Sequence, residues 1–153
     1  MKEIIKISNS SEETFNIAKE LALTVVPPVL IGLSGELGVG KTVFAKGFAS
    51  GLGVQELITS PTFLGVSESY SGKYPFIHMD FYKKVITSEI IQNYLKSNSI
   101  VLIEWFENYD LVFKEKLNFD ITVYIQYLKD NHGIILESNT QIIVNLLTQF
   151  KAL

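Results

Sequence analysis

The segment Gly35-Glu36-Leu37-Gly38-Val39-Gly40-Lys41-Thr42 matches the pattern G-x-x-x-x-G-K-[ST], known as the Walker A pattern. A continuous apolar run, Val29-Leu30-Ile31-Gly32-Leu33, precedes it, and a helical pattern from Val43 to Gly51 follows it. The alternative interpretation is a glycine-rich turn followed by a surface lysine. A buried strand that leads through a glycine-rich loop into a helix is the context that favours a phosphate-binding loop.

Each part of such a loop has a physical role toward a bound phosphate. Backbone N–H groups cradle the phosphate, and glycines permit close approach and positive φ angles. The positive end of the following helix dipole points at the anion. Lys41 would reach the β- and γ-phosphates, and the Thr42 hydroxyl would ligate Mg²⁺. The candidate phosphate-binding residues are Glu36, Leu37, Gly38, Val39, Gly40, Lys41 and Thr42.

A phosphate loop of this kind needs an acid for the metal and a group that orients water. Glu104, after the apolar run Ile100–Ile103, and Asp80, after Phe76–Met79, are the candidates. The alternative for each is an exposed acid at the end of a strand. His78 either orients Asp80 or is a core histidine.

Length and composition predict a single domain over residues 1–153. Hydrophobic residues make up 47 % of the chain and charged residues 19 %, and this hydrophobic fraction is sufficient to form a buried core. No apolar run reaches the roughly 18 residues of a membrane-spanning helix, and the N-terminus lacks the apolar core of a signal peptide. We therefore expect no membrane association and a cytoplasmic location.

The polar composition excludes several classes of site. The chain has no cysteine, hence no disulfide, thiolate zinc site or cysteine nucleophile, and two histidines cannot build a multi-histidine metal centre. All 13 basic residues are lysines, against 16 acids, for a net charge of −3, so a large basic surface for nucleic acid is not expected. Because the chain has no arginine, it cannot supply an arginine finger in cis. We expect weak turnover alone and dependence on a partner.

Hydrophobic periodicity predicts an α/β fold with a largely parallel sheet and antiparallel additions. The expected strands are residues 2–7, 29–33, 63–70, 76–79 and 100–103, followed by a hairpin of 119–128 with 134–137 across a turn at 130–133. The expected helices start at Ser10 (ending before Pro27-Pro28), Val43, Ser88 and about Thr140. In the helix from Ser88 to Lys96, the residues expected to face inward are Ile90, Ile91, Tyr94 and Leu95. The apolar stripe of the last helix suits core packing or partner docking.

Several further motifs accompany the loop, and together they resemble the TsaE (YjeE) family. They are Phe44-Ala45-Lys46-Gly47, Gly51-Leu52-Gly53-Val54, Ser60-Pro61-Thr62-Phe63, His78-Met79-Asp80-Phe81-Tyr82 and Glu104-Trp105-Phe106-Glu107. The Walker string alone indicates only a P-loop protein, whereas the full set in this order makes the match specific. The family is the bacterial ATPase of the tRNA threonylcarbamoyladenosine pathway.

The resemblance implies a small three-layer P-loop α/β domain that hydrolyses ATP to ADP and phosphate. It places Thr42 and Glu104 around Mg²⁺, Asp80 near the γ-phosphate, and a switch at Ser60–Thr62, where Thr62 would contact the nucleotide. Adenine would lie between Ser11 and the C-terminal hairpin. The implied partners are the TsaB–TsaD pair, which modifies the tRNA, so that tRNA contact is indirect.

The chain departs from the family pattern at a few positions. Glu36 stands where the family usually has Asp, and Val39 where it has a small residue, and neither change should alter the backbone cradle. Lys46 and Lys83 stand where arginines are expected, which keeps the charge but loses planar bidentate contacts. Two alternatives remain: a nucleoside or small-molecule kinase, for which no arginine-bearing lid is found, and a nucleotide-gated binding module with incidental hydrolysis.

Overall fold

The computed structural model describes residues 2–36, 38, 40–58, 65–127 and 132–138. They form a seven-stranded sheet of β1 (Lys2–Ser8), β2 (Val29–Ser34), β3 (Val66–Ser69), β4 (Phe76–Asp80), β5 (Ile100–Glu104), β6 (Ile121–Tyr127) and β7 (His132–Ser138). The helices are α1 (Ser11–Thr24), α2 (Lys41–Gly51), α3 (Ser88–Lys96) and α4 (Glu107–Phe113).

The strand order across the sheet is β1-β7-β6-β2-β5-β4-β3. The four central strands β6, β2, β5 and β4 are mutually parallel. The outer pairs, β6 with β7, β7 with β1 and β3 with β4, are antiparallel. The predicted mostly parallel sheet with an antiparallel C-terminal hairpin is therefore confirmed, and β1 forms an edge as expected.

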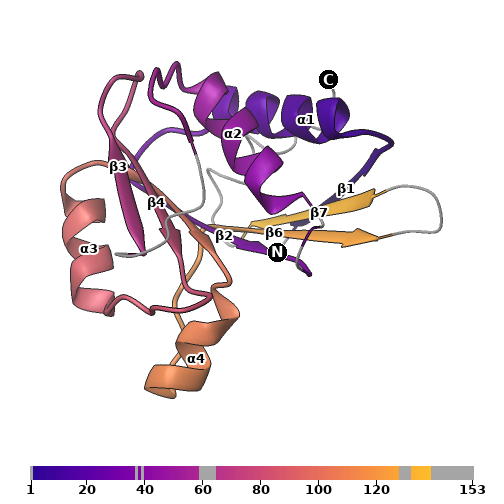
Figure 1. Ribbon diagram of the computed structural model, residues 1–153. Coiled ribbons are helices and arrows are strands. Elements are labelled where there is room, and N and C mark those ends of the chain that lie inside the picture. Colours follow the sequence, from indigo (N-terminus) through magenta and orange to yellow (C-terminus); the bar gives the residue numbers. More distant parts are fainter. Residues whose placement is uncertain (1, 37, 39, 59–64, 128–131, 139–153) are drawn as a thin grey trace.

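Helices cover both faces of this sheet, as Figure 1 shows: α1 and α2 lie together on one face, and α3 and α4 lie on the other. The first helix begins where its sequence predicts. Ser10 Oγ accepts a hydrogen bond from the Glu13 N–H at 3.1 Å, and Glu13 Oε2 accepts one from the Asn9 N–H at 2.6 Å. These two bonds satisfy donors that a helix start leaves open.

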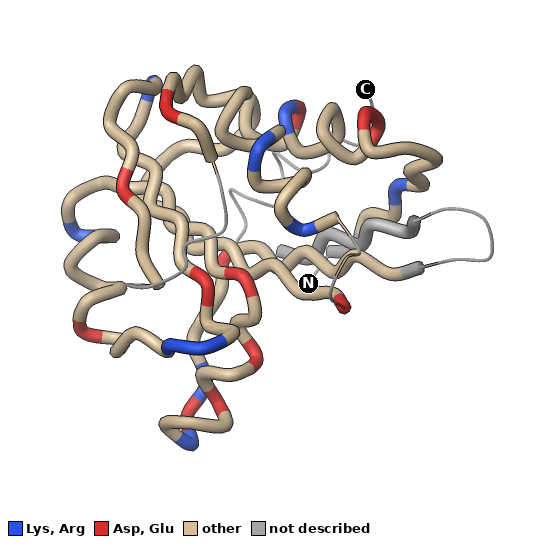
Figure 2. Tube along the Cα trace, viewed as in Figure 1, with Lys and Arg blue, Asp and Glu red and all other residues tan. Residues whose placement is uncertain are grey.

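Charged residues are spread over many separate elements of the described chain. Figure 2 shows the described lysines on several helices and connections, with acidic residues between them. Within the described residues, no helix is long and apolar enough to cross a membrane.

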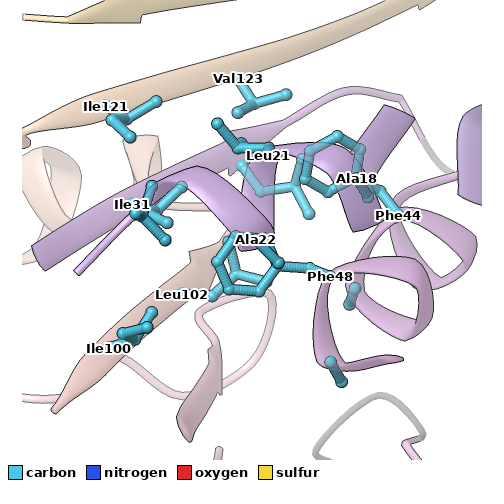
Figure 3. Packing of buried hydrophobic residues seen from close by; sticks show 14 of the residues in the cluster. Ala18, Leu21, Ala22, Ile31, Phe44, Phe48, Ile100, Leu102, Ile121 and Val123 are labelled. Carbon is cyan, nitrogen blue, oxygen red and sulfur yellow. The ribbon is translucent and has the colours of Figure 1, made fainter. Parts of the chain in front are cut away.

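Two apolar cores lie on the two faces of the sheet. Alternate residues of β2 point to opposite sides: Ile31 packs with α1 and α2, whereas Leu30 packs with the cluster around α3 and α4. Figure 3 shows side chains of the first core, among them Leu21 and Phe48, directed toward the sheet. Burying a side chain of this size contributes roughly 1.5–3 kcal/mol. The continuous apolar run at 29–33 thus reflects a strand covered on both faces.

Some expectations differ from the structure. Ile90 was expected to face inward but is 44 % exposed, while its neighbour Ile91 is fully buried. Successive helical residues point about 100° apart, so a short helix covering one face buries only one of the two. Helix α4 was not predicted, because its polar start gives little apolar periodicity. The expected helix from Thr140, residues 63–64 of the expected third strand and residues 130–131 of the expected turn lie outside the described residues.

We expect Gly47→Ala to destabilise the protein, because α1 and α2 approach each other at this position. A Cβ built on Gly47 would lie 2.1 Å from the carbonyl oxygen of Phe15 in α1. Separating the helices should cost about 1–3 kcal/mol, although alanine is the better helix former. Urea unfolding measures the change. Ser50→Ala, on the exposed side of α2, is the control, and equal stability of the two variants would contradict the close contact.

Candidate active site

The glycine-rich loop connects the carboxyl end of β2 to the first residue of α2. Gly38 and Gly40 have φ angles of 77° and 113°, a region that residues with a Cβ rarely adopt. Helix α2 begins at Lys41, two residues before the predicted start, so that Lys41 and Thr42 form its first turn. The backbone N–H groups of this first turn therefore lie at the end of the helix that meets the loop. Leu37 and Val39 lie outside the described residues.

Lys41 is the positive group of the site. Its side chain is buried, and its Nζ donates hydrogen bonds to the carbonyl oxygens of Gly35 and Glu36, the latter at 2.9 Å. The same Nζ lies 4.5 Å from the centre of the Trp105 ring. Burial lowers the pKa of Lys41, and the negative charges of Glu104, Glu107 and Asp80 partly oppose that change.

The two predicted acids meet because of strand register. In the parallel pairs, Asp80 of β4 is opposite Glu104 of β5, and Glu104 is opposite Leu33 of β2. Since the loop follows β2 directly, both acids are brought to the end of the sheet from which the loop leaves. The alternative of two exposed acids is wrong, because Glu104 is 2 % exposed and Asp80 is half-buried.

His78 contacts a different acid from the one considered in the sequence. Its Nε2 lies 2.6 Å from Glu104 Oε2, and both side chains are buried. Asp80 Oδ1 instead accepts a hydrogen bond from the Tyr82 N–H at 2.9 Å. Burial raises the pKa of Asp80 above its ordinary value, and this backbone hydrogen bond opposes the rise.

A cavity of about 320 Å³ opens where these groups converge. The residues that line it come from the loop, from the first turn of α2 and from the ends of β4 and β5: Gly38, Gly40, Lys41, Thr42, Val43, Asp80, Tyr82, Glu104 and Trp105. The described residues of the loop thus border an open cavity. A cavity with one ammonium, a helix start and two carboxylates offers partners for phosphate oxygens and for a divalent cation.

The donor set suits Mg²⁺ held together with a phosphate. In the part of the chain that the structure describes, no three histidine or acidic side chains form a metal cage. Mg²⁺ does not require one, since it keeps several waters and binds through one or two carboxylates and the phosphates of its substrate. A hydroxyl at Thr42 and a carboxylate at Glu104 on the same cavity fit that mode.

Sequence reasoning gave no role to four aromatic or acidic residues of the site, Tyr82, Trp105, Glu107 and Tyr124. Trp105 has a φ of 56°, a costly conformation for a bulky residue, and its ring packs 5.0 Å from that of Tyr82. Trp105 also lines a second cavity of about 570 Å³, together with Glu36, Glu107 and Tyr124. The positive φ directly after a buried strand depends on tertiary packing, so the sequence carried no signal for it.

The structure describes Ser11 and part of the C-terminal hairpin, the two segments between which adenine is expected. Ser11 is the first residue of α1, and β1, which leads into it, pairs with β7 of the hairpin. In the first turn of α1, the Thr14 methyl group lies 3.9 Å from a Cβ built on Gly40. The structure therefore brings the start of α1 to the loop. Thr62 and the rest of Ser60–Phe63 lie outside the described residues.

Comparison with known proteins extends these observations. A family model described as "Threonylcarbamoyl adenosine biosynthesis protein TsaE" matches residues 8–133, which include the loop and both acids. The chain belongs to the TsaE family. Membership connects this TsaE chain with tRNA threonylcarbamoyladenosine biosynthesis and confirms the resemblance noted in the sequence.

Individual TsaE proteins are similar over most of the chain. The tRNA threonylcarbamoyladenosine biosynthesis protein TsaE of Bacillus subtilis is 39 % identical over 107 residues, 69 % of this chain and 68 % of that protein. The Haemophilus influenzae protein of the same name is 33 % identical over 135 residues, 85 % of this chain and 83 % of that one. The crystal structure of YdiB from Bacillus subtilis superposes with a TM-score of 0.83 at 27 % identity, covering 99 % of this chain and 95 % of that one.

We expect Asp80→Asn to stabilise the unliganded TsaE chain at neutral pH. Because the folded state raises the pKa of Asp80, ionisation of this carboxyl opposes folding, and the stabilising effect of its protonated form is lost as the pH rises through that pKa. Asparagine keeps the oxygen that accepts from Tyr82 and removes the charge. Thermal unfolding should show a higher midpoint for the variant at pH 7. The two proteins should converge below the ordinary pKa of aspartate, and a constant difference at every pH would contradict this cause.

Proposed function

We propose that this TsaE chain hydrolyses ATP to ADP and phosphate with Mg²⁺, and that it acts with the TsaB–TsaD pair in tRNA threonylcarbamoyladenosine biosynthesis. The observation that carries the proposal is the open cavity at the loop, on which Lys41, Thr42, Asp80 and Glu104 converge. Family membership supports the pathway, and the geometry supports the chemistry.

Lys41 is placed to exchange its partners when a triphosphate binds. Its ammonium now uses the carbonyl oxygens of Gly35 and Glu36, and the β- and γ-phosphate oxygens would replace them. Burial has already removed much of the water around this charge, so the ammonium gains strongly from an anionic partner. The first turn of α2 would bind the same phosphates through its N–H groups.

Thr42 and Glu104 would hold the metal on the cavity wall. When bound, Mg²⁺ neutralises charge on the β- and γ-phosphate oxygens. One oxygen of Glu104 contacts His78, and Glu104 also lines the cavity, so its other oxygen would serve as the ligand. The carboxylate of Asp80, one strand away and opposite in register, would orient the attacking water near the γ-phosphate.

Hydrolysis at this site needs positioning more than covalent chemistry. The water oxygen forms a bond to the γ-phosphorus, and the bond from that phosphorus to the bridging oxygen of ADP breaks. The proton of the water passes to Asp80 or to a phosphate oxygen, and the raised pKa of Asp80 makes its carboxylate a better acceptor than an exposed aspartate.

We propose a partner because the chain has no arginine, and an arginine finger is the cation that accelerates phosphoryl transfer in many P-loop enzymes. Without arginine, its positive charge at the cavity is Lys41, as far as the described residues extend. The second cavity lies beside the loop, and its lining includes two acids, Glu36 and Glu107, and two aromatic residues, Trp105 and Tyr124. Such a lining suits a basic side chain from a partner protein. The lysines are scattered and the net charge is −3, so the chain offers few clustered contacts for tRNA phosphates, and we propose that it contacts tRNA only through its partners. The proposed location is the cytoplasm.

We expect TsaB–TsaD to stimulate phosphate release from ATP by this chain, since the pair would supply charge and orientation that the chain lacks. Phosphate release is measured for the protein alone, with TsaB–TsaD, and with candidate nucleosides. A phosphorylated nucleoside would instead establish a kinase, and nucleotide binding without turnover in every mixture would leave a nucleotide-gated binding module. Lys41→Ala is the control, and an unchanged nucleotide affinity and rate in that variant would refute the loop assignment.

We expect Glu104→Ala to increase the Mg²⁺ concentration required for half-maximal activity by at least about tenfold, because a metal-side carboxylate is lost. Lys83→Ala is the matched comparison, since Lys83 follows the Asp80 motif but its side chain is exposed. Activity as a function of Mg²⁺ concentration at saturating ATP separates the two variants. Equal effects would count against Glu104 as the acid on the metal side.

A further inference from the structure

His78 is a buried polar residue to which the proposed hydrolysis gives no task of its own. It lies in β4 two residues before Asp80, so that both side chains point to the sheet face covered by α1 and α2. Its ring is 1 % exposed, its Nε2 lies 2.6 Å from Glu104 Oε2, and its Nδ1 has no hydrogen-bond partner among the described residues. A buried imidazole held through a single nitrogen calls for an explanation.

The imidazole ring is anchored in the hydrophobic core. It stacks on Phe76, with ring centres 6.1 Å apart and planes 18° apart, and Phe76 in turn lies 5.7 Å from Phe48 of α2. In the sheet, His78 is opposite Leu102, two residues before Glu104. A chain of contacts thus runs from the packed core to the carboxylate that faces the cavity.

The hydrogen-bonding pattern indicates which ring nitrogen is the donor. A carboxylate oxygen accepts hydrogen bonds, so Nε2 of the ring is the donor to Glu104 Oε2. In the neutral ring, Nδ1 is then an unprotonated acceptor, and a buried acceptor without a partner is less costly than a buried N–H without one. The ring therefore acts as a fixed donor to one oxygen of Glu104.

We propose that His78 is a positioning residue that fixes the rotamer of Glu104 and leaves a single carboxylate oxygen for the Mg²⁺-bound triphosphate. The inference rests on the proposed function and adds a second residue to its metal side. Mg²⁺ demands nearly ideal octahedral geometry, so a carboxylate free to rotate binds it less well. Groups that orient a metal ligand commonly contribute tenfold to a hundredfold in affinity.

Two substitutions separate the hydrogen bond from the ring. His78→Gln places an amide N–H at about the reach of Nε2, whereas the shorter His78→Asn reaches only as far as Nδ1. Both remove the stacking on Phe76, so their effects on folding should be similar. We expect His78→Asn to raise the Mg²⁺ concentration for half-maximal binding of a fluorescent ATP analogue by about tenfold or more, and His78→Gln to restore most of the loss.

A double-mutant cycle tests whether His78 acts through Glu104. In a Glu104→Ala background, His78→Asn should change the Mg²⁺ dependence no further, because the group that it orients is gone. Independent, additive effects would overturn the proposal, as would equal Mg²⁺ dependence of the Asn and Gln variants. Nucleotide binding in EDTA should be the same in wild type and both variants.

A measurement on the unaltered protein covers the case in which His78→Asn does not fold. The chain has two histidines, so nitrogen NMR can assign the His78 imidazole, and we expect a protonated Nε2 whose signal shifts with ADP and Mg²⁺ but not with ADP in EDTA. An unprotonated Nε2, or a signal that ignores Mg²⁺, would overturn the inference. Failure of the wild type to bind any nucleotide would instead refute the proposed function.

Discussion

Parallel pairing of three adjacent strands is the constraint on which the site depends. β2 delivers the glycine-rich loop, β5 delivers Glu104 and β4 delivers Asp80, and the register of both pairs brings these groups to one edge of the sheet. A slip of one residue in either pair would turn an acid to the opposite face, since side chains alternate along a strand. The two apolar cores oppose such a slip, because it would move each side chain of these strands into the other core and disrupt the packing of both.

The site concentrates charge in a partly dry cavity, and this has a cost. Burial lowers the pKa of Lys41 and raises that of Asp80, so in both groups burial disfavours the charged form of the side chain. Trp105 adds a backbone conformation that a bulky residue seldom adopts. Such unfavourable features persist when the surrounding fold determines them, and they are common where a ligand later compensates them. These features agree with the proposal that an anion and a cation bind together at this site.

Local patterns predicted a large part of this arrangement. Three features were recognisable because each leaves a pattern of residue types over a few neighbouring positions: the capping residues Ser10 and Glu13, the helix over Ser88–Lys96 and the strand that ends at Glu104. The pairing of His78 with Glu104, 26 residues away, was not recognisable, since it depends on which strands are neighbours. The exposed Ile90 and the unpredicted α4 have the same cause. Whether an apolar residue is buried depends on which element packs against it, and the sequence does not show that element.

The sequence by itself determined the glycine-rich loop before a helix, the two acids at strand ends, the absence of arginine and, through the set of motifs, the family. These follow from residue type and spacing, which are local properties of the chain. Tertiary structure alone decided that Lys41 lies over Trp105, that one oxygen of Glu104 is held by His78, and that a second acidic and aromatic cavity opens beside the loop. Those features depend on strand order and on burial, which arise only when distant segments pack together.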